Sequence, residues 1–358
     1  MLTALVSILV FGFLIFIHEF GHYITARIFK VTIQEFSIGM GPRLFSWVSK
    51  KTNIKYSIAL LPIGGFVAMP GENGEYNDEN QNQADAYADD PNTFGKKPSW
   101  QRFIITAAGA TVNIVAGFLA MIILTCFINI GDTRVAAFYE ESELGMSVTS
   151  SETGLEKGDI ILEVDGKKVR ILDELSYEIM RRGNEPVDLL ILRDGEEMLV
   201  ENVKFPTISE QGQTVGIMDF KVKRVDKNFG SVMKYSFRKG ILIVRMCWES
   251  LYDLISGRYT FAAVSGPVGI SSAIGSAAKQ GFLQLLYIVI LISINLGVMN
   301  LLPIPALDGG RLLTLIIEMI TRKKLPAKVE GIINAVGLAL LLGLSVIIMV
   351  KDLFQLIF

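Results

Sequence analysis

Four long apolar stretches constrain the fold of this chain more than any other feature of its sequence. They cover residues 3–24, 103–130, 282–302 and 331–350. Each is long enough to cross a hydrocarbon layer of about 30 Å as a helix. Because every backbone N–H and C=O in that layer must be paired within the protein, an apolar run of this length predicts a helix. We therefore expect a polytopic α-helical membrane protein with four transmembrane helices.

The composition indicates that a soluble part accompanies these helices. Of the 358 residues, 51% are hydrophobic and the mean hydropathy is +0.43, which is too apolar for an ordinary soluble protein. The charged fraction of 20% is too high for a chain that lies wholly in lipid. The net charge of -2 gives no indication of nucleic-acid binding, so the expected partner is the lipid bilayer and not a nucleic acid.

The first apolar stretch ends in the string H-E-F-G-H, from His18 to His22. Residues four apart lie on one face of a helix, so the two imidazoles can bind one metal ion while Glu19 reaches a water on it. The chain has only these two histidines, and charged groups beside an apolar run cost about 2.5 to 3.5 kcal/mol on insertion scales. The motif therefore predicts a Zn²⁺ site with Glu19 as the general base.

The third apolar stretch ends in N-L-L-P-I-P-A-L-D-G-G, which places Asp308 between two prolines and two glycines. Irregular backbone at membrane depth is tolerated only where it is buried in protein or lines a wet cavity. A carboxylate there needs a counter-charge, which a metal held by the two histidines would supply. Asp308 is thus the predicted third ligand, and its rival Glu318 is expected on the surface of an amphipathic helix.

Residues 35–47 and 53–71 predict two strands with Gly and Pro turns, the second apolar enough to dip into the bilayer. An exposed strand edge would offer hydrogen bonds to an unwound substrate helix, and a purely structural hairpin fits the pattern equally well. Residues 72–94 contain seven acids and no Lys or Arg, which predicts a disordered linker.

The second apolar stretch contains Ala108, Gly109 and Ala110, small residues that predict close packing against the first. Asn113 follows them as a lone amide. It is a candidate for orienting substrate or a bound water.

Residues 132–206 have the pattern of a small α/β domain, and residues 132–205 contain 18 acids against 9 basic residues. The pattern predicts a strand at 160–164, a helix at 172–182 and a hairpin around Asp194-Gly195. G-L-x-x-G-D-x-I followed by V-D-G resembles a PDZ domain without a GLGF-type carboxylate loop, so docking and size filtering both remain open as its role. Residues 207–281 predict a linker and amphipathic interfacial helices.

The charges of the loops predict the orientation. Six Lys and Arg residues lie between 27 and 55 and five between 311 and 328, whereas the first ten residues carry no charge. Because positively charged loops stay in the cytosol, both termini and the PDZ-like domain are expected outside it. The chain then divides into a first membrane half (1–131), the PDZ-like domain, the linker region and a second membrane half (282–358).

Taken together, HEFGH, the N-x-x-P-x-P-x-L-D-G-G string and the PDZ-like insert resemble the site-2 protease family of intramembrane zinc metalloproteases, in particular its bacterial branch with the regulator-of-sigma-E protease. The similarity covers nearly the whole chain. It implies that His18, His22 and Asp308 hold zinc and that Glu19 is the catalytic base. It also implicates four residues before the aspartate in substrate binding, namely Asn295, Asn300, Pro303 and Pro305.

The resemblance further implies a function. Members of the family cut single-pass membrane proteins that another protease has already shortened, with anti-sigma factors and remnant signal peptides as substrates, in the bacterial cell membrane. This chain has one PDZ-like insert where some members have two. The alternatives are a metal transporter, which gives Glu19 no task, and an inactive membrane scaffold, which the intact catalytic residues disfavour.

Overall fold

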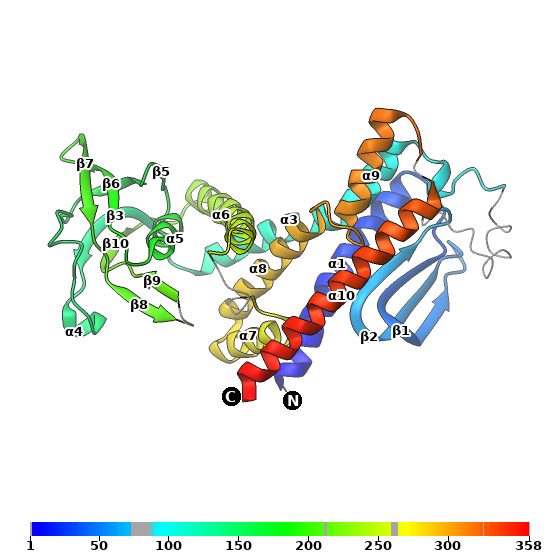
Figure 1. Ribbon diagram of the computed structural model, residues 1–358, viewed down its shortest axis with the longest axis horizontal. Coiled ribbons are helices and arrows are strands. Elements are labelled where there is room, and N and C mark those ends of the chain that lie inside the picture. The colour runs from blue at the N-terminus through cyan, green and yellow to red at the C-terminus, as the bar shows by residue number, and fades with distance from the viewer. Residues whose placement is uncertain are drawn as a thin grey trace. The chain divides into compact units, whose positions relative to one another are not determined.

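The computed structural model describes residues 2–72, 87, 89–210, 213–258, 264–324 and 326–357. The chain forms two compact units (Figure 1). Unit 1 comprises Met1–Ala120 and Glu249–Phe358, and unit 2 comprises Met121–Trp248. Most of the predicted disordered linker, namely residues 73–86 and 88, lies outside the described residues.

The four predicted membrane helices are present as α1, α3, α8 and α10. In the described part of the chain, four helices are long and apolar enough to cross a membrane, which confirms that prediction. Most of them begin or end a few residues beyond the predicted limits, because flanking residues such as Arg27 and Lys351 continue the helical backbone. Their bounds are α1 Leu2–Ile28, α3 Ser99–Phe127, α8 Phe282–Asn300 and α10 Ala327–Ile357.

Unit 1 also contains α7 (Pro267–Gln280), α9 (Asp308–Thr321) and the 3-10 helix η2 (Phe94–Lys96). α7 packs on α1 through the fully buried Ile274, which belongs to one core cluster with Val10. The backbone N–H groups of Gly266 and Gly269 both donate to Asp352 Oδ2 at 2.9 Å. Because the first turn of a helix has unpaired N–H groups, this carboxylate from α10 caps α7.

The two predicted strands of unit 1 are β1 (Glu35–Val48) and β2 (Lys55–Ala68), which lie beside α1 (Figure 1). Both strands bend. Residues 35–38 pair in parallel with 55–58 and in antiparallel fashion with 65–68, whereas 43–48 pair with 55–59 in antiparallel fashion. Among the described residues, the segment 65–68 therefore has a strand partner on one side only and offers a free edge.

An ionised carboxylate holds the bend of β1. The Arg43 guanidinium donates two hydrogen bonds of 2.8 Å to Glu35, and the Ser57 hydroxyl donates one of 2.6 Å. Burial alone raises the pKa of the Glu35 carboxyl, but these hydrogen bonds and the charge of Arg43 outweigh it, so the pKa lies below its ordinary value. The two halves of β1 are thus tied together at neutral pH.

Unit 2 is built on an antiparallel sheet with the order β10-β3-β4-β6-β7, in which the short β5 pairs with β4. The hairpin turn at Asp194 and Gly195 has positive φ at both residues, as an Asp-Gly turn between antiparallel strands requires. The elements are β3 Gly131–Phe138, α4 Glu141–Leu144, β4 Ile160–Val164, β5 Lys167–Lys168, α5 Leu172–Arg182, β6 Val187–Arg193, β7 Glu196–Val203, β8 Thr207–Glu210, β9 Gln213–Gly216 and β10 Phe220–Arg224.

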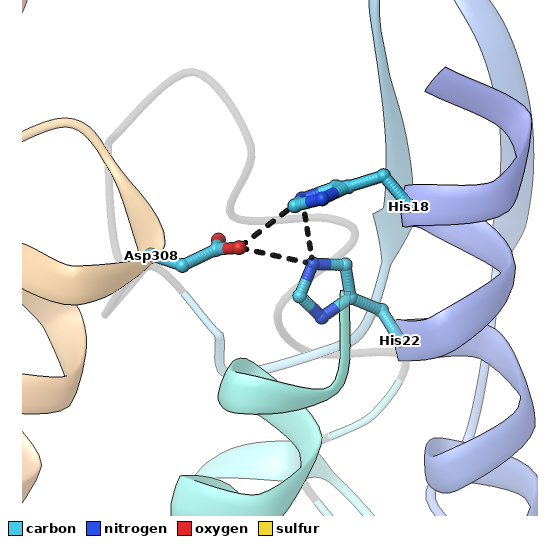
Figure 2. A group of neighbouring side chains, drawn as sticks. All are labelled: His18, His22 and Asp308. Atoms are coloured by element: carbon cyan, nitrogen blue, oxygen red, sulfur yellow. Dashed lines mark hydrogen bonds and ion pairs between the residues drawn. The ribbon is translucent and has the colours of Figure 1, made fainter. Parts of the chain in front are cut away.

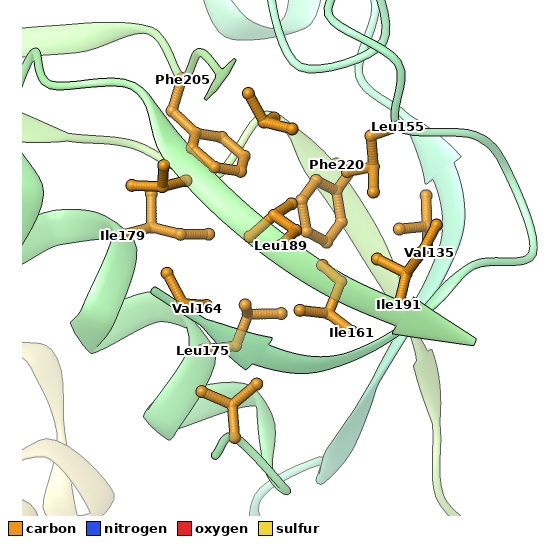
Figure 3. Packing of buried hydrophobic residues seen from close by; sticks show 13 residues of the cluster. Val135, Leu155, Ile161, Val164, Leu175, Ile179, Leu189, Ile191, Phe205 and Phe220 are labelled. Carbon is orange, nitrogen blue, oxygen red and sulfur yellow. The ribbon is translucent and has the colours of Figure 1, made fainter. Parts of the chain in front are cut away.

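The core of unit 2 lies between its sheet and α5, and Figure 3 shows its side chains. Leu175 and Ile179 of α5 are buried against inward residues of the strands, such as Leu189 and Ile191. The predicted strand at 160–164, the helix at 172–182 and the hairpin are confirmed. The likeness to a PDZ domain stays a prediction.

The predicted boundary at residue 206 is wrong. β10 pairs with β3 and places Phe220 in the core, so unit 2 extends past the point where a linker was expected. β10 is short and carries three basic residues, so its alternation is too weak to predict, and the pairing with β3 decides its conformation. The amphipathic segment that follows is a helix, α6 (Phe229–Ile255), and its place at a bilayer surface stays a prediction.

Candidate metal centre

His18, His22 and Asp308 come together from opposite ends of the chain (Figure 2). Asp308 Oδ2 lies 3.1 Å from His18 Nε2 and 3.4 Å from His22 Nε2, and the two Nε2 atoms are 3.2 Å apart. The histidines project from one face of α1, and the aspartate is the first residue of α9. All three side chains are largely buried, with exposed fractions of 12%, 11% and 23%.

The backbone of α3 determines which nitrogen of His22 carries the proton. His22 Nδ1 lies 2.8 Å from the carbonyl oxygen of Ile105. A carbonyl oxygen only accepts, so Nδ1 carries a proton, and in the neutral ring Nε2 then presents a lone pair. That lone pair faces Asp308 Oδ2, which is buried without a hydrogen-bond donor among the described residues. A cation between these two atoms would satisfy both of them.

The spacing of the three donor atoms fits zinc. Bonds of about 2.0 to 2.2 Å that meet at the tetrahedral angle separate their donor atoms by roughly 3.3 to 3.6 Å. The observed separations of 3.1 to 3.4 Å are close to that range. Two imidazoles and one carboxylate leave one coordination position open, as in catalytic zinc sites. When bound, zinc supplies a Lewis acid that lowers the pKa of a water to about 7.

Glu19 lies at the next position of α1, and its side chain is buried. β2 passes directly against it, because a Cβ atom on Gly65 would lie 2.7 Å from Glu19 Cγ. Only glycine permits so close an approach. The buried carboxylate and the free edge of segment 65–68 are therefore neighbours.

A tight turn before α9 positions Asp308. Pro303 and Pro305 prevent α8 from continuing, and Ala306 has a φ of 69°. The chain folds back so closely that a Cβ atom on Gly309 would lie 1.9 Å from the carbonyl oxygen of Leu302. The first glycine after the aspartate is thus required by the close backbone approach, and the carboxylate begins a helix whose dipole favours it.

The predicted close packing of the first two membrane helices is confirmed, and this packing shapes the space around the two histidine rings. A Cβ atom on Gly21 would lie 2.6 Å from the carbonyl oxygen of Ala108. A Cβ atom on Gly109 would lie 2.3 Å from His22 Nε2 and 2.8 Å from His18 Nε2. Gly109 therefore makes the space that both imidazoles occupy.

The four residues that the family resemblance implicates in substrate binding lie ahead of Asp308. Asn295 and Asn300 are in the second half of α8, and Pro303 and Pro305 are in the turn that follows. Asn295 and Pro303 are exposed, while the other two are half-buried. Their contact with substrate stays a prediction.

Two polar residues that the sequence singled out are at least partly buried in unit 1. Asn113 has no exposed surface, and its side-chain nitrogen is 3.3 Å from His18 Nδ1, so it lies beside a predicted zinc ligand; its role toward substrate or a bound water stays a prediction. Glu318 is half-buried and not on an open surface, because it forms an ion pair with Arg102 and accepts a 3.1 Å hydrogen bond from Ser99.

Sequence reasoning missed the contributions of Ile105 and Gly65. No signal marks the carbonyl of Ile105, since every residue has one and only the packing of α3 on α1 selects it. Gly65 was detectable only as part of a Gly-Gly turn signal.

Two imidazoles, a carboxylate and an adjacent buried glutamate, carried by apolar helices, define a zinc metalloprotease of the membrane-embedded class. The model of Peptidase family M50 matches residues 6–344. This chain belongs to peptidase family M50, the site-2 proteases, and it is a zinc metalloprotease.

Its relatives agree with this assignment over their whole length. A Clostridium perfringens protein named as a zinc metalloprotease is 35% identical over 348 residues, which cover 97% of each chain. The regulator of sigma-W protease of Bacillus subtilis is 27% identical over an alignment of 419 positions, which covers 98% of each chain. The zinc metalloprotease RasP of Bacillus licheniformis is 28% identical, with 98% of each chain covered.

Proposed function

We propose that this protein cuts single-pass membrane proteins within the bilayer, with zinc held by His18, His22 and Asp308 and with Glu19 as the general base. One observation carries the proposal. Two imidazole nitrogens and one carboxylate oxygen, each able to bind a metal, face one another within 3.4 Å, and a buried glutamate stands beside them. A cation bound among these three groups would satisfy their lone pairs, and a water on that cation would give Glu19 a proton to take.

Glu19 and the residues that position the metal donors have different roles in hydrolysis. Glu19 takes a proton from the attacking water and delivers it to the nitrogen of the leaving amine as the peptide bond breaks. The turn before Asp308 and the contact of α3 on α1 hold the donor set rigid.

The free edge of segment 65–68 is where substrate binds in this proposal. A protease cuts an extended backbone, and a membrane helix that unwinds must find new hydrogen-bond partners. The edge supplies them next to Glu19, because Gly65 brings the strand against that side chain. Asn295, Asn300, Pro303 and Pro305 would contact the same substrate.

The proposed setting is the bacterial cell membrane. The basic loops face the cytosol, while both termini and the PDZ-like domain lie outside. The proposed substrates are membrane proteins that another protease has already shortened, such as anti-sigma factors and remnant signal peptides. The name of the Bacillus subtilis relative, regulator of sigma-W protease, supports anti-sigma factors as substrates.

Cleavage of a tagged single-pass membrane protein by the purified full chain in detergent tests the proposal. We expect cleavage that stops after a chelator removes the metal and returns when zinc is added. A panel of such substrates that stays uncut while zinc is bound would contradict it. Zinc uptake into sealed vesicles by the same preparation would then favour the transporter.

Asp308→Ala should weaken zinc binding and abolish cleavage together. Removal of the only anionic donor leaves two neutral imidazoles, and we expect a loss of zinc affinity of at least about tenfold. Zinc content after dialysis against a competing chelator measures it, with Asp194→Ala in the exposed hairpin of unit 2 as the control. Unchanged zinc content in Asp308→Ala would remove this residue from the ligand set.

A further inference from the structure

Asn113 of α3 has an unusual environment for a polar side chain. It is completely buried, and its Nδ2 atom lies 3.3 Å from Nδ1 of His18. Its Oδ1 atom is buried without a hydrogen-bond partner among the described residues. Burying an amide in a membrane helix with an unpaired oxygen costs free energy, so this environment indicates a function for the side chain.

The two ends of an amide have nearly the same shape, so the orientation of Asn113 follows from its hydrogen bonds. With the nitrogen toward His18, Nδ1 must accept, and the ring proton sits on Nε2. That proton would occupy the atom that faces Asp308 and His22. With the amide reversed, the oxygen accepts from Nδ1–H, and Nε2 of His18 presents a lone pair to the donor set.

We propose that the side-chain oxygen of Asn113 accepts a hydrogen bond from Nδ1 of His18 and thereby holds this ring in the tautomer that binds metal through Nε2. Asn113 is then a positioning residue. A histidine that binds a metal almost always donates its other ring N–H to a carboxylate, carbonyl or water, and these partners set its orientation. The inference rests on the metal centre of the proposed function.

The proposal makes α3 the common support of both histidines. His22 donates to the carbonyl oxygen of Ile105, and His18 donates to the side chain of Asn113, eight residues further along the same helix. Eight residues correspond to about two turns, so both acceptors lie on one face of α3. Gly109 lies midway between them and leaves space for both rings.

The packing of α3 against α8 fixes the amide in place. The hydroxyl of Ser293 donates to the backbone carbonyl of Asn113 at 2.8 Å. One turn away, a Cβ atom on Gly297 would lie 2.7 Å from the carbonyl oxygen of Ala110. These contacts hold the backbone of α3 at Asn113 in place, next to His18.

Three variants of the purified full chain test the role of the acceptor. Asn113→Leu keeps the branching and the number of side-chain heavy atoms but removes the oxygen, so we expect zinc affinity to fall by about tenfold to a hundredfold, measured by competition with a chelator. Asn113→Asp restores an acceptor and should stay within about threefold of wild type. Thr106→Val, another buried polar deletion on α3, is the matched control and should leave affinity unchanged. The absorption spectrum of the cobalt-substituted protein should change only in Asn113→Leu.

Zinc binding by folded Asn113→Leu as tight as wild type, with an unchanged cobalt spectrum, would overturn the proposal. Equal losses in Asn113→Leu and Asn113→Asp would also overturn it.

A measurement on the wild-type protein avoids dependence on variants that fail to fold. The chain has only two histidines, so ¹⁵N-imidazole labelling gives four ring signals. In the metal-free protein we expect both rings protonated at Nδ1. A neutral His18 ring protonated at Nε2 alone would overturn the proposal. This readout needs no proteolysis, so its failure is distinct from a failure of the proposed activity.

Discussion

Glu19→Gln should lose cleavage by about a hundredfold to ten-thousandfold while the protein keeps its zinc. Glutamine has the same shape but cannot take the proton of the attacking water. Glu19 is not one of the three donor groups, so the ion should remain. The rate of cleavage of a tagged single-pass substrate, measured with the zinc content of the same sample, checks both parts.

Glu197→Gln, an exposed glutamate on β7, is the matched control and should cleave at the wild-type rate. Cleavage by Glu19→Gln within about tenfold of wild type would mean that another group is the base. Loss of zinc from Glu19→Gln would instead place this side chain among the ligands.

Gly109→Ala should empty the metal site and abolish cleavage, although the substitution adds a single methyl group. The new Cβ atom would lie 2.3 Å from His22 Nε2, closer than real side chains come. The backbones of α1 and α3 cannot separate easily, because they already meet at Gly21 and Ala108, so the imidazoles must turn aside. Zinc per chain, measured on the purified protein, should fall below one tenth of the wild-type value.

Gly12→Ala on α1 is the control for a glycine substitution in a membrane helix. A Cβ atom at that position meets nothing within 4 Å, so zinc content and cleavage should be those of wild type. Full zinc occupancy in Gly109→Ala would show that the two helices separate enough to accommodate the methyl group, and it would weaken the role assigned to α3.

The sequence and the structure agree where a local pattern is long or repeated. The four apolar helices, the helix at 172–182 and the hairpin at Asp194-Gly195 follow from hydrophobic periodicity and turn chemistry. The domain boundary at 206 was wrong because β10 has five residues and three of them are basic. A strand this short is decided by its partner β3, which local patterns do not reveal.

At the candidate site, too, some features follow from local sequence patterns and others only from the tertiary structure. The spacing of His18 and His22 determines that their rings share a face of α1, and a carboxylate in a broken apolar stretch requires a counter-charge, so the donor types follow from the sequence. The placement of Asp308 Oδ2 within 3.4 Å of both rings is a tertiary result, because the two segments are far apart in the chain.

By itself, the sequence determined the class of this protein: apolar helices that bear a zinc-binding motif, accompanied by a small α/β domain. Only the tertiary structure decided what surrounds the donors. It placed Asn113 beside His18 and Gly65 against Glu19, and it assigned the carbonyl of Ile105 to His22. Side-chain periodicity is a property of one helix or strand, whereas these contacts depend on how closely two backbones approach, and that distance is set by packing across the whole unit.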